Sequence, residues 1–345
     1  MKELATIKDI AREANVSVTT VSNVIHNRAS RVSTETVNRV QSILEKYNYI
    51  PNMNARSLVN NKSKLIGVFF NQLTEGTLFE SPFNTEILGG VDEILKDNGY
   101  YLLVRSISSI SEIQQVLKTW KIDGVICLGF LVNDVIDLER SINTPLVLID
   151  IEVDHKNSRS MHLTVGINDW EGSKIATEHL IENGHHNIGF VSYPIVSGGV
   201  IERRYLGYLE ALNNHGVKQN KEFIFEYDKT KVSLAEFCDE IVKKIDDITG
   251  LVFTADYLAI EIMDNLKNKG ILVPNDLSVV GFDDIVMSQF VSPKLTSIRQ
   301  DIRLKGRKAA TLLIESLNVD TNQESKKVEL PIQLITRESV KKFKK

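Results

Sequence analysis

The sequence predicts an all-α headpiece that contains a helix-turn-helix, followed by a larger α/β core with two lobes and parallel sheets. Residues 1–51 show short amphipathic helical patterns and no strand pattern. From residue 65 onward, apolar strands alternate with amphipathic helices across short connections, which is typical of parallel sheets. This alternation runs through two successive sets, and we expect one lobe for each set.

Length and composition place the chain among soluble globular proteins. A chain of 345 residues is too long for one ordinary domain, and 42% of its residues are hydrophobic against 25% charged. It contains no apolar run of about eighteen residues, and its N-terminus is charged where a signal peptide needs an apolar core. We therefore expect a cytoplasmic protein that does not contact membranes. We expect Cys127 and Cys238 to be buried, reduced thiols.

The net charge of −4 is distributed unevenly. Residues 1–64 contain ten Lys or Arg against five Asp or Glu, so this segment carries +5 and the remainder carries −9. The overall charge alone argues against nucleic-acid binding, but a basic head on an acidic body reverses that argument. We expect the head to contact phosphate and the body not to.

Three helices are predicted in the head. Thr6 and Asp9 fit a capping box at the start of the first helix, whose apolar residues share one face. The pattern breaks at 15–17, and Ser17 is a suitable cap for a second helix over 18–25. Ser33 caps a third helix, which closes the core. Two short helices joined by a three-residue turn form a helix-turn-helix.

A three-helix bundle can be purely structural, but the outward face of the second helix argues against that interpretation. Small and short polar side chains stand there instead of the Glu and Lys of an idle surface: Val18, Thr19, Thr20, Ser22, Asn23 and His26. Such side chains suit the base edges and phosphates of a DNA major groove. We therefore predict that residues 1–51 form a DNA-binding domain.

Residues 52–64 are predicted to be a hinge helix and linker. The segment 52–60 follows Pro51 and has the pattern of one short helix, which is too short to be stable alone in water. Leu58 within it has no evident core to enter. Both features are accounted for if this helix forms only when it packs against DNA and against the same helix of a second subunit.

The body, residues 65–345, is predicted to form an effector-binding and dimerisation core. The first set of strands is expected at 65–70, 100–104, 124–128 and 146–150, with helices at 86–97 and 111–119. The second set has helices at 169–183, 203–215, 233–245 and 257–269, with strands at 188–192, 223–226, 250–253 and 277–281. The predicted lobes are 65–166 with 296–326, and 167–295 with 327–340. Ligands bind at the carboxyl ends of such strands, here in a cleft between the lobes.

The head closely resembles the lac-repressor/galactose-repressor family. The motifs TIKDIAREANVSVTTVSNVIHN, VSTETVNRVQSILEKYNYIPN and NARSL carry the resemblance in the head, and GHHNIGFVS, IERRYLGYLEAL, VPNDLSVVGFDD, SPKLTSIRQD and LPIQLITRES extend it through the body. The resemblance implies a transcriptional regulator and not an enzyme. It also implies a core like that of the periplasmic sugar-binding proteins.

The same resemblance implies roles in DNA recognition. The second helix would lie in the major groove, with Val18, Thr19 and Asn23 at the base-reading positions, and Leu58 would wedge into the minor groove. Members commonly carry Arg where this chain has Asn23; Arg suits guanine and Asn suits adenine, so we expect a different operator half-site. The expected DNA-binding residues are Thr6, Ser17, Val18, Thr19, Thr20, Ser22, Asn23, His26, Asn27, Arg31, Asn52, Ala55, Arg56 and Leu58.

Arg204 and Asp283 match positions that hydrogen-bond the effector in the family. Arg204 lies at a predicted helix start, and Asp283 follows the strand 277–281. A guanidinium fork and a carboxylate can each grip two adjacent hydroxyls, which suits a sugar. Without the resemblance, a surface salt bridge for Arg204 and a loop cap for Asp283 are equally good interpretations.

Three weaker candidates complete the expected effector site. Asp256 follows another strand end, but its neighbour Ala255 stands where many members have a polar residue, often Asn, which leaves the identity of the sugar open. Phe83 and Asn84 are expected in the loop before helix 86–97. Phe83 either stacks on a ligand ring or packs in the core.

The predicted function is repression of a carbohydrate-utilisation operon, controlled by a sugar or sugar phosphate between the lobes. The alternative effector is a purine, a nucleoside or a protein co-repressor. An enzyme with a DNA-binding head, such as a sugar kinase, is the rival class, but no P-loop, GxSxG or HExxH motif is present. The adjacent His185 and His186 point apart and lack a third ligand, so we expect no metal or other cofactor. The expected partners are near-palindromic operator DNA and a second copy of the chain.

Overall fold

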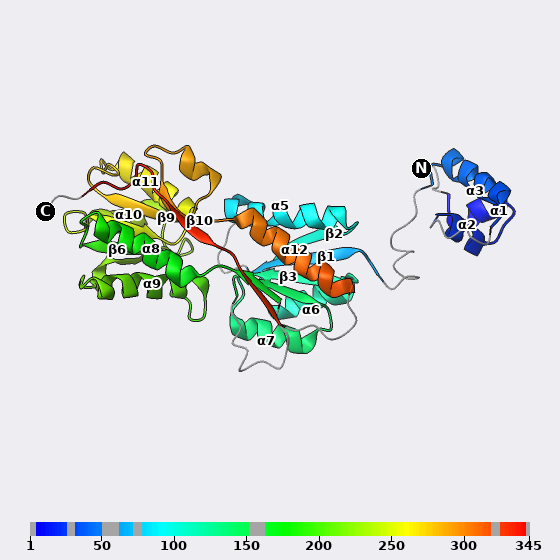
Figure 1. The fold of residues 1–345 in the computed structure, drawn as a ribbon, viewed down its shortest axis with the longest axis horizontal. Helices are drawn as coiled ribbons and strands as arrows, with labels where there is room; N and C mark the ends of the chain where they lie inside the picture. Colours follow the sequence, from blue (N-terminus) through cyan, green and yellow to red (C-terminus); the bar gives the residue numbers. More distant parts are fainter. Residues whose placement is uncertain are drawn as a thin grey trace. The chain divides into compact units, whose positions relative to one another are not determined.

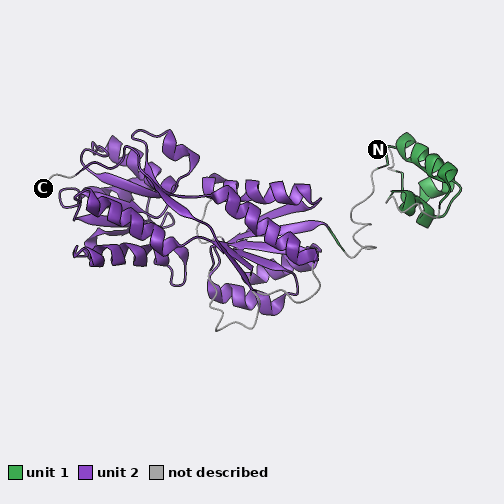
Figure 2. Cartoon of the chain, in the orientation of Figure 1, with its two compact units in different colours: residues 1–63 green, residues 64–345 purple. Residues whose placement is uncertain are grey.

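The computed structural model describes residues 5–25, 32–49, 62–71, 78–151, 163–318 and 325–342. The chain divides into two compact units, residues 1–63 and residues 64–345 (Figure 2). The first unit is helical, and the second contains all the strands that the structure describes (Figure 1). Within the described residues, no helix has the length and apolar character needed to cross a bilayer. Cys127 and Cys238 are both buried free thiols.

The first unit contains α1 (Ile7–Glu13), α2 (Val18–Ile25) and α3 (Thr34–Lys46) around one apolar core. Each predicted cap is confirmed. Thr6 and Asp9 form a reciprocal capping box, Ser17 Oγ accepts from the Thr20 amide at 3.0 Å, and Ser33 accepts from the amide of residue 36. Asn15 has a positive φ of 52°, a left-handed conformation that Asn tolerates, and it turns the chain between α1 and α2.

The third helix is tied to the first by polar contacts. Arg39 Nε donates to the Ala14 carbonyl at 3.2 Å, and Lys46 Nζ donates to Glu13 at 2.6 Å. The Lys46 hydrogen bond holds the pKa of Glu13 below its usual value. Two of the basic side chains in the head therefore stabilise the bundle.

The first lobe contains a parallel sheet in the order β11-β5-β4-β3-β1-β2. Its strands are β1 (Leu65–Asn71), β2 (Tyr101–Ile107), β3 (Gly124–Leu128), β4 (Leu146–Ile149), β5 (Leu163–Gly166) and β11 (Lys326–Glu329). Side chains alternate along β1: Ile66, Val68 and Phe70 pack with α5 (Pro82–Asp97) and α12 (Ile302–Asn318), whereas Phe69 packs with α6 (Ile110–Thr119) and α7 (Val132–Ser141). Burial on both faces explains why the strand sequence is continuously apolar.

The second lobe repeats this architecture with the order β12-β10-β9-β8-β6-β7. Its strands are β6 (Ile188–Ser192), β7 (Ile224–Glu226), β8 (Gly250–Phe253), β9 (Ser278–Asp283), β10 (Thr296–Gln300) and β12 (Ile332–Ile335), of which β12 is antiparallel to β10. Residues of α8 (Asp169–Glu182) and α9 (Val200–Asn214) join one core cluster. Those of α10 (Leu234–Val242) and α11 (Asp256–Asn268) join another. Short 3-10 turns η1 (Leu78–Glu80), η2 (Lys221–Phe223) and η3 (Val286–Gln289) complete the element order.

The chain passes between the lobes at places that differ from the predicted boundaries. The prediction assigned 296–326 to the first lobe, but β10 pairs with β9 in the second-lobe sheet, so this passage comes after Gln300. It assigned residues from 327 to the second lobe, but β11 pairs with β5 in the first-lobe sheet, and that passage comes before β12. Strand pairing between distant segments decides these boundaries, and that pairing cannot be inferred from a local apolar pattern in the sequence.

Several element ends also differ from the prediction in ways that affect the site. Helix α5 begins at Pro82, so Phe83 and Asn84 lie in its first turn and not in a preceding loop. Helix α9 begins at Val200, which places Arg204 in its second turn. Strand β9 continues to Asp283, which is its last residue. The predictions contained no counterpart of α7, β5, β10, α12, β11 or β12.

Glycines allow the paired helices of the first lobe to approach closely. A Cβ on Gly90 of α5 would lie 2.1 Å from the Arg303 carbonyl oxygen of α12, and a Cβ on Gly306 would lie 2.2 Å from the Ile87 carbonyl oxygen. Both contacts are with backbone, which cannot rotate away. The approach of α5 to α12 therefore depends on glycine at these two positions.

We predict that Gly90→Ala lowers the free energy of unfolding by about 1–3 kcal/mol, because the added methyl group forces the two helices apart. Gly89→Ala is the matched control on the same helix. Its Cβ would meet only the flexible end of the Arg303 side chain, so helix propensity makes that substitution neutral or stabilising. Urea denaturation of both variants measures the difference. Equal losses in the two variants would contradict the close-packing explanation.

Candidate functional site

The second helix of the first unit presents the side chains expected to read DNA. Val21 and Val24 of α2 are buried in the bundle, whereas Val18 is 41% exposed and Thr19 is also exposed. Thr20, Ser22 and Asn23 are half-buried. The core thus fixes the rotation of α2 about its axis and leaves the expected face accessible.

Two of the expected DNA contacts also cap helices. Thr6 Oγ1 donates to Asp9 at 2.6 Å, and Ser17 Oγ lies 2.9 Å from Thr20 Oγ1. Both residues are exposed, and each lies at a helix N-terminus, where backbone N–H groups favour a phosphate. The remaining expected contacts lie outside the described residues: His26, Asn27, Arg31, Asn52, Ala55, Arg56 and Leu58. The predicted hinge helix 52–60 also lies outside them.

A cavity of about 290 Å³ lies between the two lobes of the second unit. The first lobe contributes residues at the carboxyl ends of β1, β2 and β3 and in the first turn of α5, where Phe83 and Asn84 line the wall. The second lobe contributes Asp283 from the carboxyl end of β9 and residues that follow β6, β8 and β9. The cavity thus lies where parallel sheets commonly bind ligands. Three of the five expected effector residues line it.

Ring side chains form much of the cavity wall. Phe70 and Phe83 come from the first lobe, and Tyr193 and Tyr257 come from the second. Phe83 also packs against the core, so the two roles considered for it coexist. Lys229 and Glu80 add one charge of each sign. A ligand with an apolar ring face and polar edges matches this lining.

Asp283 is the most constrained residue in the cavity wall. Its φ is 114°, a conformation that side-chain-bearing residues seldom adopt, and its side chain is almost completely buried. Gln300 Nε2 donates to Oδ1 at 2.7 Å. Burial raises the pKa of Asp283 to about 6, although Arg204 and Gln300 oppose that shift. The carboxylate is therefore charged at neutral pH but loses its charge in mild acid.

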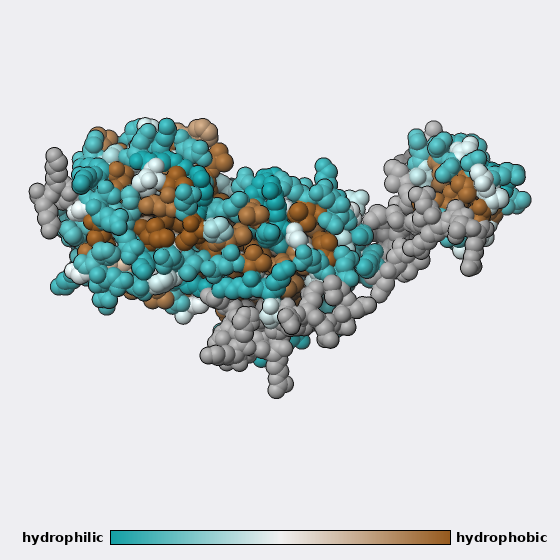
Figure 3. Space-filling view, viewed as in Figure 1, coloured by the Kyte–Doolittle hydropathy of each residue, from teal (hydrophilic) through white to brown (hydrophobic). Residues whose placement is uncertain are grey.

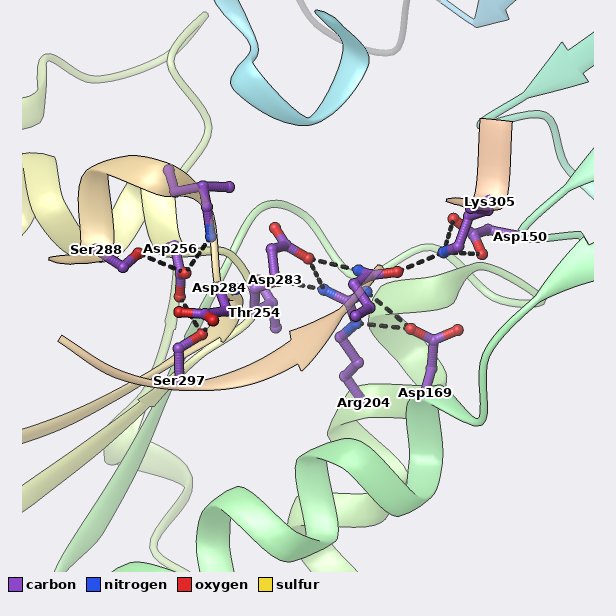
Figure 4. Close-up of polar contacts among 12 residues, drawn as sticks. Asp150, Asp169, Arg204, Thr254, Asp256, Asp283, Asp284, Ser288, Ser297 and Lys305 are labelled. Carbon is purple, nitrogen blue, oxygen red and sulfur yellow. Dashed lines mark hydrogen bonds and ion pairs between the residues drawn. The ribbon is translucent and has the colours of Figure 1, made fainter. Parts of the chain in front are cut away.

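Arg204 lies behind Asp283 and does not line the cavity. Its Nε donates to Asp169 Oδ1 at 2.9 Å, its NH1 donates to the Thr254 carbonyl, and NH1 lies 3.8 Å from Asp283 Oδ1 (Figure 4). The guanidinium carbon also lies 3.6 Å from the centre of the Phe282 ring. Arg204 is 6% exposed, so the surface salt bridge considered for it is wrong. The structure places it as a buried support for Asp283.

Asp256 has a different environment from the one expected. Its side chain is fully buried and accepts hydrogen bonds from the Ile285 amide at 3.0 Å, Ser288 Oγ at 2.7 Å and Ser297 Oγ at 2.6 Å (Figure 4). Burial raises its pKa to about 8. Its chain neighbours, Ala255 and Tyr257, line the cavity, but Asp256 does not. Its contacts tie α11 to the segment after β9, which is a structural role.

The sequence did not indicate the buried polar residues around the Asp283 carboxylate. Asp150, Asp169, Gln300 and Lys305 are all at least nine-tenths buried and belong to the same network of contacts. A weak signal exists, because Gln300 and Lys305 flank the passage between the lobes in the segment RQDIRLKG. Only strand pairing brings that segment beside Asp283.

The first of the two adjacent histidines, His185, has a structural environment, whereas His186 is exposed. His185 is fully buried in the second lobe, its Nε2 lies 3.0 Å from the Lys341 carbonyl oxygen, and burial lowers its pKa. In the parts of the chain that the structure describes, no three His, Cys, Asp or Glu side chains form a metal-binding group.

Comparisons with known proteins agree with the two-unit architecture. Residues 6–52 match the family model of bacterial regulatory proteins of the lacI family, and residues 177–340 match that of a periplasmic binding protein-like domain. The repressor PurR of Actinobacillus pleuropneumoniae is 33% identical over 349 residues, covering 99% of this chain and all of that protein. A probable repressor ExuR of Bacillus subtilis is 30% identical over 342 residues, covering 99% of each chain.

Solved structures show the same fold. The transcriptional regulator CelR in complex with cellobiose is 26% identical, with a TM-score of 0.69 over 97% of this chain and 99% of that one. The lac repressor dimer bound to operator and the anti-inducer ONPF is 24% identical, with a TM-score of 0.82 over 98% of this chain and all of that one. Family members are transcriptional repressors and not enzymes. The chain belongs to the lacI family of bacterial regulatory proteins, and it is a DNA-binding transcriptional repressor with an effector-binding domain.

Proposed function

We propose that this repressor controls a carbohydrate-utilisation operon, and that a sugar or sugar phosphate bound between the lobes controls its affinity for DNA. The observation that carries the proposal is the carboxylate of Asp283 in the cavity wall. Its Oδ1 accepts from Gln300, and no described side chain donates to Oδ2. Asp283 lines the cavity, so a sugar hydroxyl bound there can donate to its carboxylate.

The cavity wall supports a sugar in a second way. The rings of Phe70, Phe83, Tyr193 and Tyr257 offer flat apolar surfaces beside the carboxylate. A pyranose or furanose has an apolar face of C–H groups and a rim of hydroxyls, which corresponds to this division. The similarity to CelR, whose structure contains cellobiose, points in the same direction.

A purine is the second candidate effector, and the sequence similarity favours it. Repressors named PurR match this chain over nearly its full length at up to 33% identity. The aromatic wall would also stack on a purine, and Asp283 could accept a purine N–H. One fold can serve either ligand class, so binding measurements must decide between them.

The expected DNA-binding residues remain a proposal. In it, α2 enters the major groove of near-palindromic operator DNA, and the segment 52–60 becomes helical against the minor groove. Effector binding changes how the two lobes close and thereby changes the pairing of the hinge helices of two subunits. Such coupling requires that the effector bind one closure state more tightly than the other.

A homodimer is proposed as the active form, with an exposed apolar patch of the second lobe in the interface. The patch consists of Val286 (61% exposed), Met287 (41%) and Phe290 (80%), all within or next to η3. On the face shown in Figure 3, hydrophobic side chains of both lobes also reach the surface, bordered by hydrophilic ones. Three large apolar side chains together on one turn are typical of a contact surface.

Asp283→Asn tests the effector site. Purified protein is screened by thermal shift and titration calorimetry against D-glucose, D-galactose, D-ribose, cellobiose, sugar phosphates, hypoxanthine, guanine and adenosine. We expect a sugar to stabilise the protein, and Asp283→Asn to weaken its binding roughly tenfold to hundredfold by removing a charged hydrogen-bond acceptor. Affinity should also fall as the pH drops through about 6, because protonated Asp283 accepts hydrogen bonds less well.

The control for this experiment is Asp264→Asn, which neutralises an exposed carboxylate of α11 in the same lobe. It should leave affinity unchanged. Stabilisation by a purine base and by no sugar would replace the sugar proposal with its alternative. Full affinity in Asp283→Asn would show that the effector binds elsewhere.

Asn23→Arg tests base reading by α2. Selection from randomised operators should yield a half-site with guanine at the affected position, and each altered base pair should change the free energy of binding by roughly 1–3 kcal/mol. Gln41→Arg adds the same charge at an exposed position of α3 and should change only general affinity, not sequence preference. An Asn23→Arg protein that selects the original half-site would contradict a base contact.

Phe290→Asp tests the proposed interface. A charge within the patch should convert the dimer to a monomer, measured by sedimentation velocity, and should lower operator affinity at equal salt concentration. Trp120→Asp, at a 53% exposed site in the first lobe, is the control and should leave the dimer intact. A dimer that persists in Phe290→Asp would exclude this patch as the main subunit contact.

A further inference from the structure

A continuous line of buried polar groups leads from the cavity carboxylate into the first lobe. Asp283 Oδ1 accepts from Gln300 Nε2 at 2.7 Å, and Gln300 Oε1 accepts from Lys305 Nζ. Lys305 Nζ also donates to both carboxylate oxygens of Asp150, at 2.6 and 2.8 Å (Figure 4). Gln300 ends β10 of the second lobe, whereas Lys305 belongs to α12 of the first lobe. Gln300 is 3% exposed and Lys305 is fully buried, so solvent does not compete for these contacts.

The lysine determines which end of the Gln300 amide faces Asp283. An ammonium group has donors and no acceptor, so the amide atom beside Lys305 has to be the oxygen. The amide nitrogen therefore faces Asp283, and its N–H requires an acceptor there. A carboxylate meets that requirement better than a carboxylic acid. Lys305 thus acts on Asp283 by fixing the orientation of the Gln300 amide dipole.

We propose that Lys305 is a positioning residue for the effector site: by fixing the Gln300 amide, it keeps Asp283 as a hydrogen-bond acceptor. The effector role of Asp283 rests on the proposed function above, whereas the arrangement of Lys305, Gln300 and Asp283 does not. The consequence is selectivity, because an Asp283 side chain held as an acceptor favours ligands that offer O–H or N–H donors. Ligands that present a carboxylate at this point are disfavoured.

Besides Lys305, other charged or titratable groups lie near Asp283, Gln300 and Asp150 and affect the pKa values of the two carboxylates. Arg204 approaches Asp283 from α9, and Asp169 pairs with Arg204 from α8. Asp256 and Tyr193 also interact with Asp283 through its charge. Burial raises the pKa of Asp150, and Lys305 opposes that shift. The contacts of Asp256 are with Ser288, Ser297 and Ile285, so changes at Lys305 or Gln300 leave them in place.

Without Lys305 the amide is free to rotate. Asp150 would then take up a proton, because a buried carboxylate without its cation becomes neutral. Gln300 could present its oxygen to Asp283, and that arrangement favours a protonated Asp283. Loss of Lys305 should therefore raise the pKa of Asp283 through the amide, in addition to removing the direct effect of the Lys305 charge, which also lowers that pKa.

The test is a carbon-13 NMR titration of full-length protein labelled at the aspartate carboxyl carbon, over roughly pH 5 to 9. The signal that disappears in Asp283→Asn belongs to Asp283. Its midpoint should be near pH 6 in the unmodified protein and higher by about one unit in both Lys305→Met and Gln300→Met. Gln300→Met leaves the Lys305–Asp150 ion pair intact, so it reports on the amide even if Lys305→Met does not fold.

Lys308→Met is the matched control, because it removes the same charge from an exposed position on the same helix. Its Asp283 midpoint should equal that of the unmodified protein. A midpoint that stays unchanged in Lys305→Met, or in Gln300→Met, would overturn the proposal. The titration uses no ligand, so a raised midpoint together with full effector affinity in Asp283→Asn would sustain the effect of Lys305 on Asp283 and reject only the effector role of Asp283.

Discussion

The buried guanidinium of Arg204 is the constraint on which the cavity depends. A charge removed from water costs several kcal/mol unless it is paired and hydrogen-bonded, and Arg204 is only 6% exposed. Asp169 and the Thr254 carbonyl satisfy it on one side, and the Phe282 ring covers it. Asp283, 3.8 Å away, completes the neutralisation while it also faces the cavity. The requirement to pair one buried cation therefore places a carboxylate where a ligand can reach it.

The doubly wound sheets explain why so many polar side chains meet at one place. Asp150 follows β4, Asp283 and Gln300 end β9 and β10, and Thr254 follows β8, so all four lie at carboxyl ends of parallel strands. These ends lack further strand pairing and leave backbone and side-chain groups to be satisfied by one another. The passage after Gln300 then brings α12 and its lysine to the same point.

The junction between the lobes is also where an effector can act at a distance. The ligand class depends on the residues of the cavity and not on the fold. In this chain the cavity carboxylate is joined through Gln300 to Lys305 and Asp150 of the first lobe. A ligand that donates a hydrogen bond to Asp283 therefore binds to one end of a chain of contacts that spans both lobes. Coupling of cavity occupancy to lobe closure further requires that the ligand bind one closure state more tightly than the other.

Local features of the chain were determined by the sequence alone. The caps at Thr6, Ser17 and Ser33, the helix-turn-helix and most strands and helices of the core follow from hydrogen bonds and periodicities within a few residues. Motif resemblance further selected Arg204 and Asp283. The tertiary structure alone decided that Arg204 supports the site from behind, that Asp256 is structural, and that Gln300 and Lys305 join the site. Each of these depends on contacts between residues that strand pairing brings together from distant parts of the chain, and no local pattern encodes such contacts.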